Sequence, residues 1–344
     1  MPIFLAAALF AGARAPAAPD DATGVQVVRD DANQRVDILI DGQPFTSYIY
    51  PTTIKKPVLF PLRTAQGTII TRGFPPGPGE RADHPHHVGL WFNYSNVNGY
   101  DFWNNSDAIK PEDRPKYGTI YERAIVATKS GPEKGVLETK SDWVIPDGTT
   151  LLKQDTKYVF RGGADFRSVD LIATLEAQDK TVVFGDNKDG LLGMRVRREL
   201  EMPSTEPGIF TDANGNVTKV PPMDNSIVTG NYLTSEGKSG DAAWATRGRW
   251  CILTGKIGAE PVTIAIFDDP QNPNSPTYWH ARGYGLFAAN PFGVKDFTGG
   301  KQTLNYTMQP HQVVTFRYRV LILSKTAAPA EIEKAYQGFL ADYP

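Results

Sequence analysis

The chain has 344 residues, and its formal net charge is -2, from 36 lysines and arginines against 38 aspartates and glutamates. This near-balance gives no positive field for a phosphate backbone, so nucleic acid is not an expected partner. The single cysteine, Cys251, excludes an intramolecular disulfide, and its apolar neighbours predict a buried thiol.

The N-terminus has the composition of a leader. The apolar stretch over residues 3–13 is too short to cross a bilayer but fits the h-region of a secretory signal, and Ala13-Arg14-Ala15 resembles a cleavage site. We expect residues 1–20 to be a signal peptide or a disordered leader, and the mature protein to be periplasmic or secreted. The later sequence contains no run of about 18 apolar residues, so no transmembrane segment is expected in the mature chain.

Short runs rich in Val, Ile, Thr and aromatic residues, separated by glycine and proline turns, predict β-strands. Val36–Ile40 ends at Asp41-Gly42, a strong hairpin signal, and Pro44–Tyr50 is the expected return strand. Further strands are predicted at 68–71, 119–128, 135–144, 151–160, 168–177, 181–184, 250–255, 261–267, 286–288, 302–308 and 312–323. Most of these runs alternate, which favours antiparallel sheets with one wet face.

The clear helical pattern is C-terminal. Pro329 suits a first helical position, and Ile332, Tyr336, Phe339 and Leu340 form one apolar stripe. Many strands and one helix predict an all-β fold, a large antiparallel β-sandwich with a short C-terminal helix. Without a repeat or a linker, residues 21–344 are expected to form a single domain.

The strongest candidate site is the run Asp83-His84-Pro85-His86-His87, between a Gly/Pro-rich loop and an apolar strand. Imidazoles suit proton transfer and metal binding, so His84, His86 and His87 are candidate catalytic groups. On a strand, His84 and His86 would share one face and His87 would lie on the other. The pair could then bind a divalent metal ion, with Asp83 orienting an imidazole. The alternative is that these side chains only cap turns.

A second dense region runs from Tyr278 to Phe287. Rings beside hydrogen-bonding groups suit sugars, whose C–H faces stack while their hydroxyls need fixed partners. His280 is a further candidate catalytic group. The candidate substrate-binding residues of this region and of two aromatic-polar turns are Trp103, Tyr278, Trp279, Arg282 and Asn290. Arg282 could instead bind a carboxylate through two hydrogen bonds. The structural alternative is an ordinary packed strand, with the arginine side chain reaching into water.

A third region contributes carboxylates. Alternation would place Arg195, Arg197 and Glu199 on one strand face, which makes Glu199 a candidate general acid or base. Asp186, in a loop bounded by glycines, is a second candidate carboxylate.

These motifs resemble the bacterial family labelled "methane oxygenase PmoA". The resemblance rests on Asp83–Phe92, Asp101–Trp103, Gly185–Gly190, Pro276–His280 and Asn290–Gly293. A particulate methane monooxygenase subunit has several membrane-spanning helices, and this chain lacks the apolar runs for them at a mean hydropathy of -0.34. Proteins resembling this one occur in saccharolytic bacteria near sugar oxidoreductase genes. The resemblance therefore implies carbohydrate catabolism by association.

The sequence thus predicts an exported carbohydrate-active protein that binds a small saccharide or glycan. A glycan-degrading hydrolase or lyase with a His-rich acid/base or metal site is the favoured function. A non-catalytic glycan-binding protein and a metal-dependent oxygenase are the two alternatives. Three clustered histidines favour an enzyme, because a sugar platform needs rings and amides more than imidazoles. The residues fix neither the sugar nor the oligomeric state.

Overall fold

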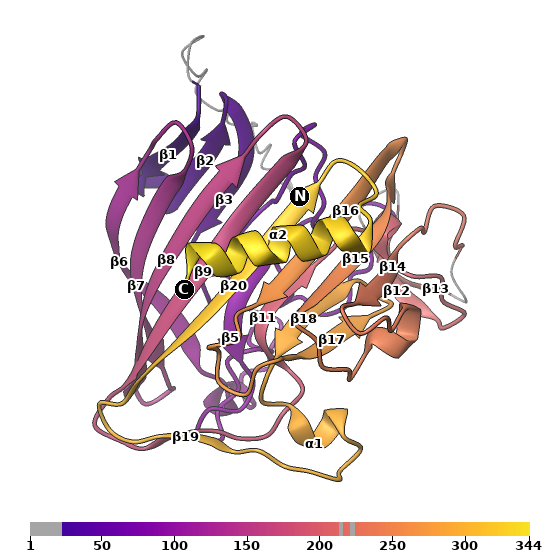
Figure 1. The fold of residues 1–344 in the computed structure, drawn as a ribbon. Coiled ribbons are helices and arrows are strands. Elements are labelled where there is room, and N and C mark those ends of the chain that lie inside the picture. Colours follow the sequence, from indigo (N-terminus) through magenta and orange to yellow (C-terminus); the bar gives the residue numbers. More distant parts are fainter. Residues whose placement is uncertain (1–22, 213–215, 221–223) are drawn as a thin grey trace, which may run out of the picture.

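The computed structural model describes residues 23–212, 216–220 and 224–344, and two large antiparallel sheets pack face to face in it (Figure 1). The strands of the first sheet are, in spatial order, β1 (Val25–Asp30), β2 (Arg35–Ile40), β3 (Gln43–Ile49), β4 (Val58–Leu59), β5 (Leu90–Tyr94), β11 (Gly190–Arg195), β18 (Leu286–Asn290) and β17 (Tyr278–Arg282). This architecture confirms the predicted all-β sandwich.

The second sheet has the same number of strands. They are, in spatial order, β14 (Asn231–Thr234), β15 (Trp250–Ile257), β16 (Glu260–Asp268), β20 (Val313–Leu323), β9 (Phe166–Ala177), β8 (Thr150–Gly162), β7 (Gly135–Val144) and β6 (Thr119–Lys129). Two small sheets pair β10 (Val182–Phe184) with β19 (Tyr306–Met308) and β12 (Gly208–Thr211) with β13 (Val217–Val220). The short helix α1 spans Val294–Phe297.

The main core lies between the two large sheets, because alternate side chains of each strand point inward. From the first sheet, Ile38 and Phe92 are buried there, and from the second, Leu171 and Phe316. Phe92 and Phe316 meet across the interface with ring centroids 5.7 Å apart. Burial of this apolar surface is the dominant stabilising term.

Helix α2 (Pro329–Asp342) crosses the outer face of the second sheet (Figure 1). Ile332, Tyr336 and Phe339 pack there against Phe267 and other apolar residues of β15, β16 and β20. The predicted C-terminal helix and its apolar stripe are therefore confirmed, with Leu340 partly buried at its edge. No helix of this length covers the outer face of the first sheet within the described residues.

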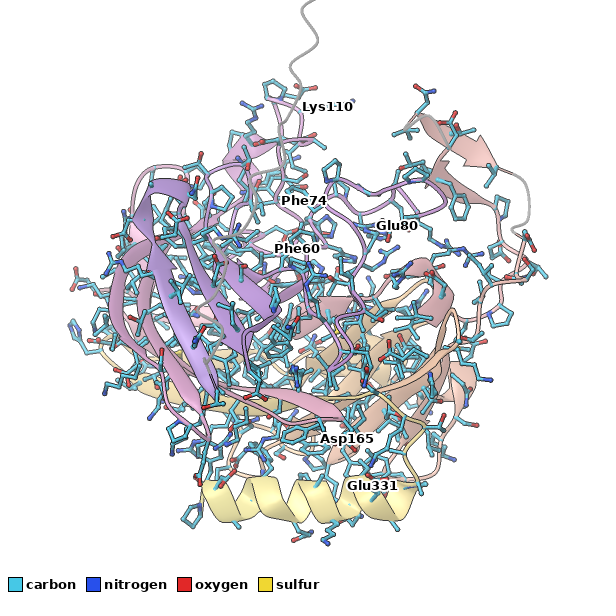
Figure 2. All side chains as sticks on the ribbon, turned by 90° about the horizontal axis from the view of Figure 1, so that it is seen from above. Phe60, Phe74, Glu80, Lys110, Asp165 and Glu331 are labelled. Atoms are coloured by element: carbon cyan, nitrogen blue, oxygen red, sulfur yellow. The ribbon has the colours of Figure 1, made fainter. Side chains whose placement is uncertain are left out.

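The connection between β4 and β5, residues 60–89, lies on the opposite side of the molecule from α2. Phe60, Phe74 and Glu80 mark it in Figure 2, where Glu331 marks the helix. The connection contains only isolated bridges, such as Arg63 with Ile69, so the strand predicted at 68–71 is wrong. Loops this long without regular structure are usually functional inside a compact fold. This one carries the histidine run.

The predicted leader, residues 1–20, lies outside the described residues, and the single domain beyond it stays a prediction. No helix within the described ranges is both long enough and apolar enough to cross a membrane.

Candidate functional site

The histidine run is a tight turn and not a strand. The His87 N–H donates to the His84 carbonyl at 2.9 Å, and His84 has a φ of 46°. The expected sharing of one strand face by His84 and His86 is therefore wrong, because β5 begins only at Leu90. The predicted place of the run, at a loop-to-strand junction, is confirmed. Left-handed backbone at a residue with a side chain is costly and tends to occur at functional sites.

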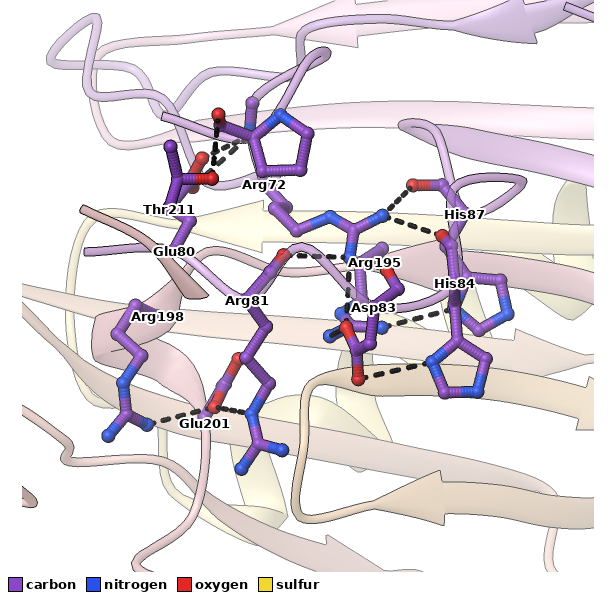
Figure 3. Close-up of polar contacts among 12 residues, drawn as sticks. Arg72, Glu80, Arg81, Asp83, His84, His87, Arg195, Arg198, Glu201 and Thr211 are labelled. Atoms are coloured by element: carbon purple, nitrogen blue, oxygen red, sulfur yellow. Dashed lines mark hydrogen bonds and ion pairs between the residues drawn. The ribbon is translucent and has the colours of Figure 1, made fainter. Parts of the chain in front are cut away.

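Two buried arginines fix the conformation of this turn (Figure 3). The Arg72 guanidinium donates to the backbone carbonyls of Arg81, Asp83, His84 and His87 at 2.5–3.1 Å. Arg195, at the end of β11, approaches His87 Nδ1 at 3.2 Å through Nη1. Because a guanidinium only donates, His87 Nδ1 accepts, and the proton of the neutral ring lies on Nε2.

Asp83 joins both arginines to His84. Its Oδ1 accepts from Arg195 at 2.6 Å and from Arg72 at 3.1 Å, while Oδ2 lies 3.1 Å from His84 Nδ1. Burial alone would raise the pKa of Asp83. The contact with His84 and the charges of Arg195 and Arg72 outweigh burial and hold the pKa well below its usual range. Asp83 is therefore a carboxylate that orients the His84 ring.

His84 is the imidazole of the cluster that reaches solvent, with 39% of its side chain exposed. Its ring stacks between His87, at a centroid distance of 4.7 Å, and Tyr284, at 5.1 Å. Tyr284, in the β17–β18 turn, is held in turn by Arg195, whose Cζ lies 4.9 Å from the ring centroid. Since Nδ1 faces Asp83, Nε2 of His84 is left to take up or release a proton.

His86 and His87 are buried, and burial lowers the pKa of each well below the usual value. Their Nε2 atoms have no hydrogen-bond partner among the described residues. Buried polar atoms are rarely left unpaired, so such atoms indicate a place for a bound polar group.

Lys56, which the sequence analysis missed, lies beneath this cluster. Its Nζ donates to the His86 carbonyl at 2.8 Å and sits 5.4 Å from the Trp91 ring centroid. Lys56 and His86 both line a cavity of about 130 Å³. Burial lowers the pKa of Lys56 to about 7, although the charge of Asp101 opposes this shift. No sequence signal separates Lys56 from Lys55 beside it, which is only partly buried.

Replacing Lys56 with methionine is expected to change how stability depends on pH. The folded-state pKa near 7 is below the ordinary value of 10.5. Protonation of Lys56 therefore favours the unfolded chain. The free energy of unfolding is highest above the unfolded pKa and decreases as the pH falls towards 7. From about pH 6 to about pH 9, wild type should gain about 2–3 kcal/mol relative to Lys56→Met in urea unfolding. Lys55→Met is the matched control, and an equal pH response in both variants would contradict the buried lysine.

His280 lies on the same sheet face as the histidine turn. Strand register aligns Trp91 of β5, Gly193 of β11, Ala288 of β18 and His280 of β17 in one row. With strands about 4.8 Å apart, the row spans roughly 14 Å. His280 Nδ1 is 2.9 Å from the Lys188 carbonyl, so it donates and leaves Nε2 as an acceptor. Burial lowers the pKa of His280 to about 3, so this ring is neutral.

Gly193 is required by close packing in this row. A Cβ there would lie 2.7 Å from ring atoms of both Trp91 and Trp103. Gly193→Ala is therefore expected to destabilise the fold by about 1–3 kcal/mol in chemical unfolding. Gly338→Ala on exposed α2, where a Cβ meets nothing within 4 Å, should be neutral or stabilising. A neutral Gly193→Ala would show that the two indoles are loosely packed.

The largest described cavity near the turn, about 620 Å³, borders Tyr284. Its other lining residues are Arg81, Pro203, Ser204, Thr205, Glu206, Asn225, Asp241, Trp244, Ala281, Arg282 and Gly283. The Arg282 guanidinium lies 5.7 Å from the ring centroids of both Trp244 and Tyr284. This volume suits a saccharide.

Most of the other predicted substrate-binding residues are buried away from this cavity. Trp279 faces the inter-sheet core, opposite to its strand neighbours, and packs against Phe287. Trp103 is buried against Trp91 and His87. Neither ring offers a free face for a sugar.

Tyr278 and Asn290 have structural partners. Tyr278 stacks on Phe297 at a centroid distance of 5.2 Å. The Asn290 side chain donates to the Asn187 carbonyl at 2.9 Å and accepts from the Phe292 N–H at 2.8 Å. Of the residues predicted to bind substrate, only Arg282 lines the large cavity.

The predicted carboxylates also lie elsewhere. β11 ends at Arg195, and Glu199 falls in a 3-10 turn, so the expected alternation through Glu199 is wrong. Glu199 pairs with Arg197 at 2.5 Å. Glu201 instead accepts hydrogen bonds from the buried Arg81 and Arg198. Asp186 accepts from the N–H groups of Lys295 and Leu304 and so fixes a turn.

A metal site at His84 and His86 stays a prediction. Their ring centroids are 5.6 Å apart, and the rings are nearly perpendicular. Within the described ranges, no group of three or more His, Cys, Asp or Glu side chains is arranged to hold a metal ion. Asp83 contacts the His84 ring, as expected of a residue that orients it.

Comparison with known proteins identifies the family of this chain. A family model matches residues 35–337, which is most of the chain. The chain belongs to a family of unknown function (DUF6807). No curated protein matches it. The match leaves the resemblance to the PmoA-labelled family as an expectation.

Solved structures resemble the chain only distantly. A putative aldose 1-epimerase from Escherichia coli K12 has 9% identity and a TM-score of 0.36, covering 87% of this chain and 98% of that one. A galactose mutarotase related enzyme from Lactobacillus acidophilus has 10% identity and a TM-score of 0.33, covering 88% and 98%. The GH36 α-galactosidase AgaA from Geobacillus stearothermophilus has 10% identity and a TM-score of 0.35, covering 88% and 41%. Similarity at this level assigns neither a substrate nor a reaction to this chain.

Proposed function

We propose that this DUF6807 protein is a carbohydrate-active enzyme in which His84 transfers a proton to or from a bound saccharide. The observation that carries the proposal is the Asp83–His84 pair. It combines an ionised carboxylate, an oriented and solvent-exposed imidazole, and a backbone held at a φ of 46°. These features match what a general acid or base requires, namely a neighbouring charge that stabilises its protonated form and access to the reacting atom.

The chemistry follows from the two ring nitrogens. The Asp83 carboxylate, 3.1 Å from Nδ1, stabilises the protonated ring by its charge, and Nε2 is the nitrogen that faces away from Asp83. The neutral ring acts as a base through Nε2, and the protonated ring acts as an acid through the same atom. Tyr284, stacked on the ring, has its pKa raised to about 12 by burial, so its hydroxyl stays protonated and can donate. A hydrolase uses such a group on the leaving oxygen, and a lyase uses it on a carbon-bound proton.

The neighbouring cavity supports a saccharide as the ligand. It combines the rings of Trp244 and Tyr284 with amide, hydroxyl, carboxylate and guanidinium groups. Aromatic faces stack on the C–H faces of sugars, and the mixed polar groups suit both the donor and the acceptor sides of hydroxyls. Because Tyr284 borders the cavity and also contacts His84, a ligand there would lie beside the proposed proton-transfer group.

A non-catalytic glycan-binding protein would use the same cavity, but two features favour catalysis. A strained residue such as His84 is costly, and a binding platform gains nothing from it. The carboxylate–imidazole pair likewise adds little to sugar binding, whereas proton transfer requires it.

We further propose that the enzyme is exported, because residues 1–20 have the composition of a secretory leader. Cell fractionation followed by N-terminal sequencing tests this. A mature chain that begins after Ala15 in the periplasm or medium is the expected result. An intact N-terminus retained in the cytoplasm would contradict it.

A glycan screen tests the enzymatic proposal. Purified full-length protein is incubated with a panel of oligosaccharides, and products are followed by reducing-end assay and by mass spectrometry. A hydrolase product gains the mass of water, whereas a lyase product carries a double bond that absorbs ultraviolet light. Cleavage of at least one glycan supports the proposal. Binding by calorimetry without turnover on any glycan would instead identify a binding protein.

A further inference from the structure

Four buried arginines surround the site, and among the described residues two carboxylates are paired with them (Figure 3). The exposed fractions of Arg72, Arg81, Arg195 and Arg198 are 3%, 7%, 0% and 5%. Asp83 is shared by Arg72 and Arg195, and Glu201 is shared by Arg81 and Arg198. The cluster therefore has more guanidinium than carboxylate charge, which is costly in a buried place.

Compensation of this charge is least complete at Arg81. Arg72 also donates hydrogen bonds to four backbone carbonyls, and Arg198 donates one to the Asp224 carbonyl at 2.8 Å. Arg81 uses only its Nε, which donates to Glu201 at 2.9 Å, and its guanidinium packs 5.7 Å from the Phe210 ring centroid. Its terminal nitrogens form no hydrogen bond within the described part of the chain.

Arg282 is a second guanidinium without an acceptor among the described residues. It forms no hydrogen bond or ion pair with any of them, and its Cζ lies 5.7 Å from the ring centroids of both Trp244 and Tyr284. Contact with two rings restricts the positions that the guanidinium can take. Arg81 and Arg282 both line the 620 Å³ cavity.

A further unpartnered donor lies beside Arg282. The indole Nε1 of Trp244 is buried without a partner among the described residues. An indole N–H and a guanidinium can only donate, so the missing group must be an acceptor. Glu206 and Asp241 also line the cavity, but they are exposed and form no ion pair with either arginine. They remain available as acceptors for sugar hydroxyls.

We propose that the ligand is an acidic saccharide whose carboxylate binds between Arg81 and Arg282. This inference rests on the proposed function and narrows its substrate to glycans that contain a uronic acid. A carboxylate offers two coplanar acceptor oxygens, which match the donor pairs of a guanidinium, and the bond is charge-assisted. The bound carboxylate also supplies the counter-charge that the arginine cluster lacks.

Calorimetry with matched ligands tests the inference. The probes are uronic-acid oligosaccharides, the same oligosaccharides after chemical reduction of their carboxyl groups, and oligosaccharides without uronic acid whose negative charge comes from a sulfate ester. The acidic form should bind at least about tenfold more tightly than its reduced form, because hydrogen bonds to charged groups are strong. The difference in affinity between the acidic and reduced forms should shrink as salt is added, because salt screens the ionic contact.

Variants then locate the carboxylate. Arg282→Gln should remove the preference for the acidic form, so that the acidic and reduced forms bind with affinities within about twofold of each other. Arg123→Gln is the control, because Arg123 is a half-exposed arginine 5.4 Å from the Tyr121 ring centroid on β6, outside the cavity. Its preference should be unchanged. Circular dichroism of both variants checks that the fold is retained.

The outcomes separate the two proposals. Equal binding of acidic and reduced forms, an unchanged preference in Arg282→Gln, or tighter binding of the sulfated probe would overturn the carboxylate assignment. Turnover of neutral glycans in the same experiment would leave the proposed enzyme in place. Absence of both binding and turnover with every probe would overturn both proposals.

Discussion

Replacement of His84 with asparagine is expected to lower turnover of the substrate at least about 100-fold, with little change in KM. A positioned acid/base group contributes about 10²–10⁴-fold to the rate, and this substitution removes the imidazole. Asparagine is chosen because it tolerates left-handed backbone better than most residues, and His84 has a φ of 46°. The turn should therefore keep its shape, so that kcat reports the loss of the proton-transfer group.

The chain supplies a matched control in His311. This residue also has left-handed backbone, with a φ of 62°, and 67% of its side chain is exposed. His311→Asn makes the same chemical change at a comparable backbone conformation, away from the cluster. Its kcat should stay within about twofold of wild type, as expected for a surface histidine. Equal losses in both variants, or full activity of His84→Asn, would show that His84 does not transfer the proton.

Much of the fold follows from local sequence patterns. The Asp41-Gly42 turn has left-handed backbone at both residues, as the favoured two-residue hairpin turns require, and it joins β2 to β3 as predicted. The apolar stripe of α2 could be predicted from the sequence, because its apolar residues recur at the helical period and are the ones that become buried. Strand β1 was not predicted, because its second half, Val28–Asp30, is largely exposed and ends in two charged residues. Its position depends on pairing with β2, which local composition does not encode.

The site was predictable as a region but not as a set of contacts. The histidine turn precedes β5, and Tyr278–Arg282 forms β17 of the same sheet. Strands β11 and β18 lie between these two strands. Strand alternation alone places His280 and Arg282 on one face and Trp279 on the other. Tyr284 lay within the predicted aromatic region but was not singled out there. Arg72 and Glu201 carried no local signal, because their roles arise from contacts between distant segments of the chain.

Removal of the shared carboxylate is the substitution expected to cost the most stability. Asp83→Asn leaves the Arg195 and Arg72 guanidiniums buried without their ionised partner. Breaking a buried pair by removing one partner typically costs about 3–5 kcal/mol, and the 20% exposure of the Asp83 side chain places this case near 3 kcal/mol. Urea unfolding near neutral pH measures the loss. Circular dichroism identifies any variant that fails to fold, which would be the extreme form of the same result.

The pH dependence of Asp83→Asn provides the independent check. Because the folded-state pKa of Asp83 is held below its usual range, its stabilisation is present above the unfolded pKa and disappears as the pH falls through the folded pKa. The stability difference between wild type and variant should therefore narrow in acid. Asp142→Asn is the matched control, since its side chain is also 20% exposed but pairs only with the half-exposed Arg123. Exposed pairs contribute about 0–1 kcal/mol, so equal losses in both variants would contradict a buried Asp83 network.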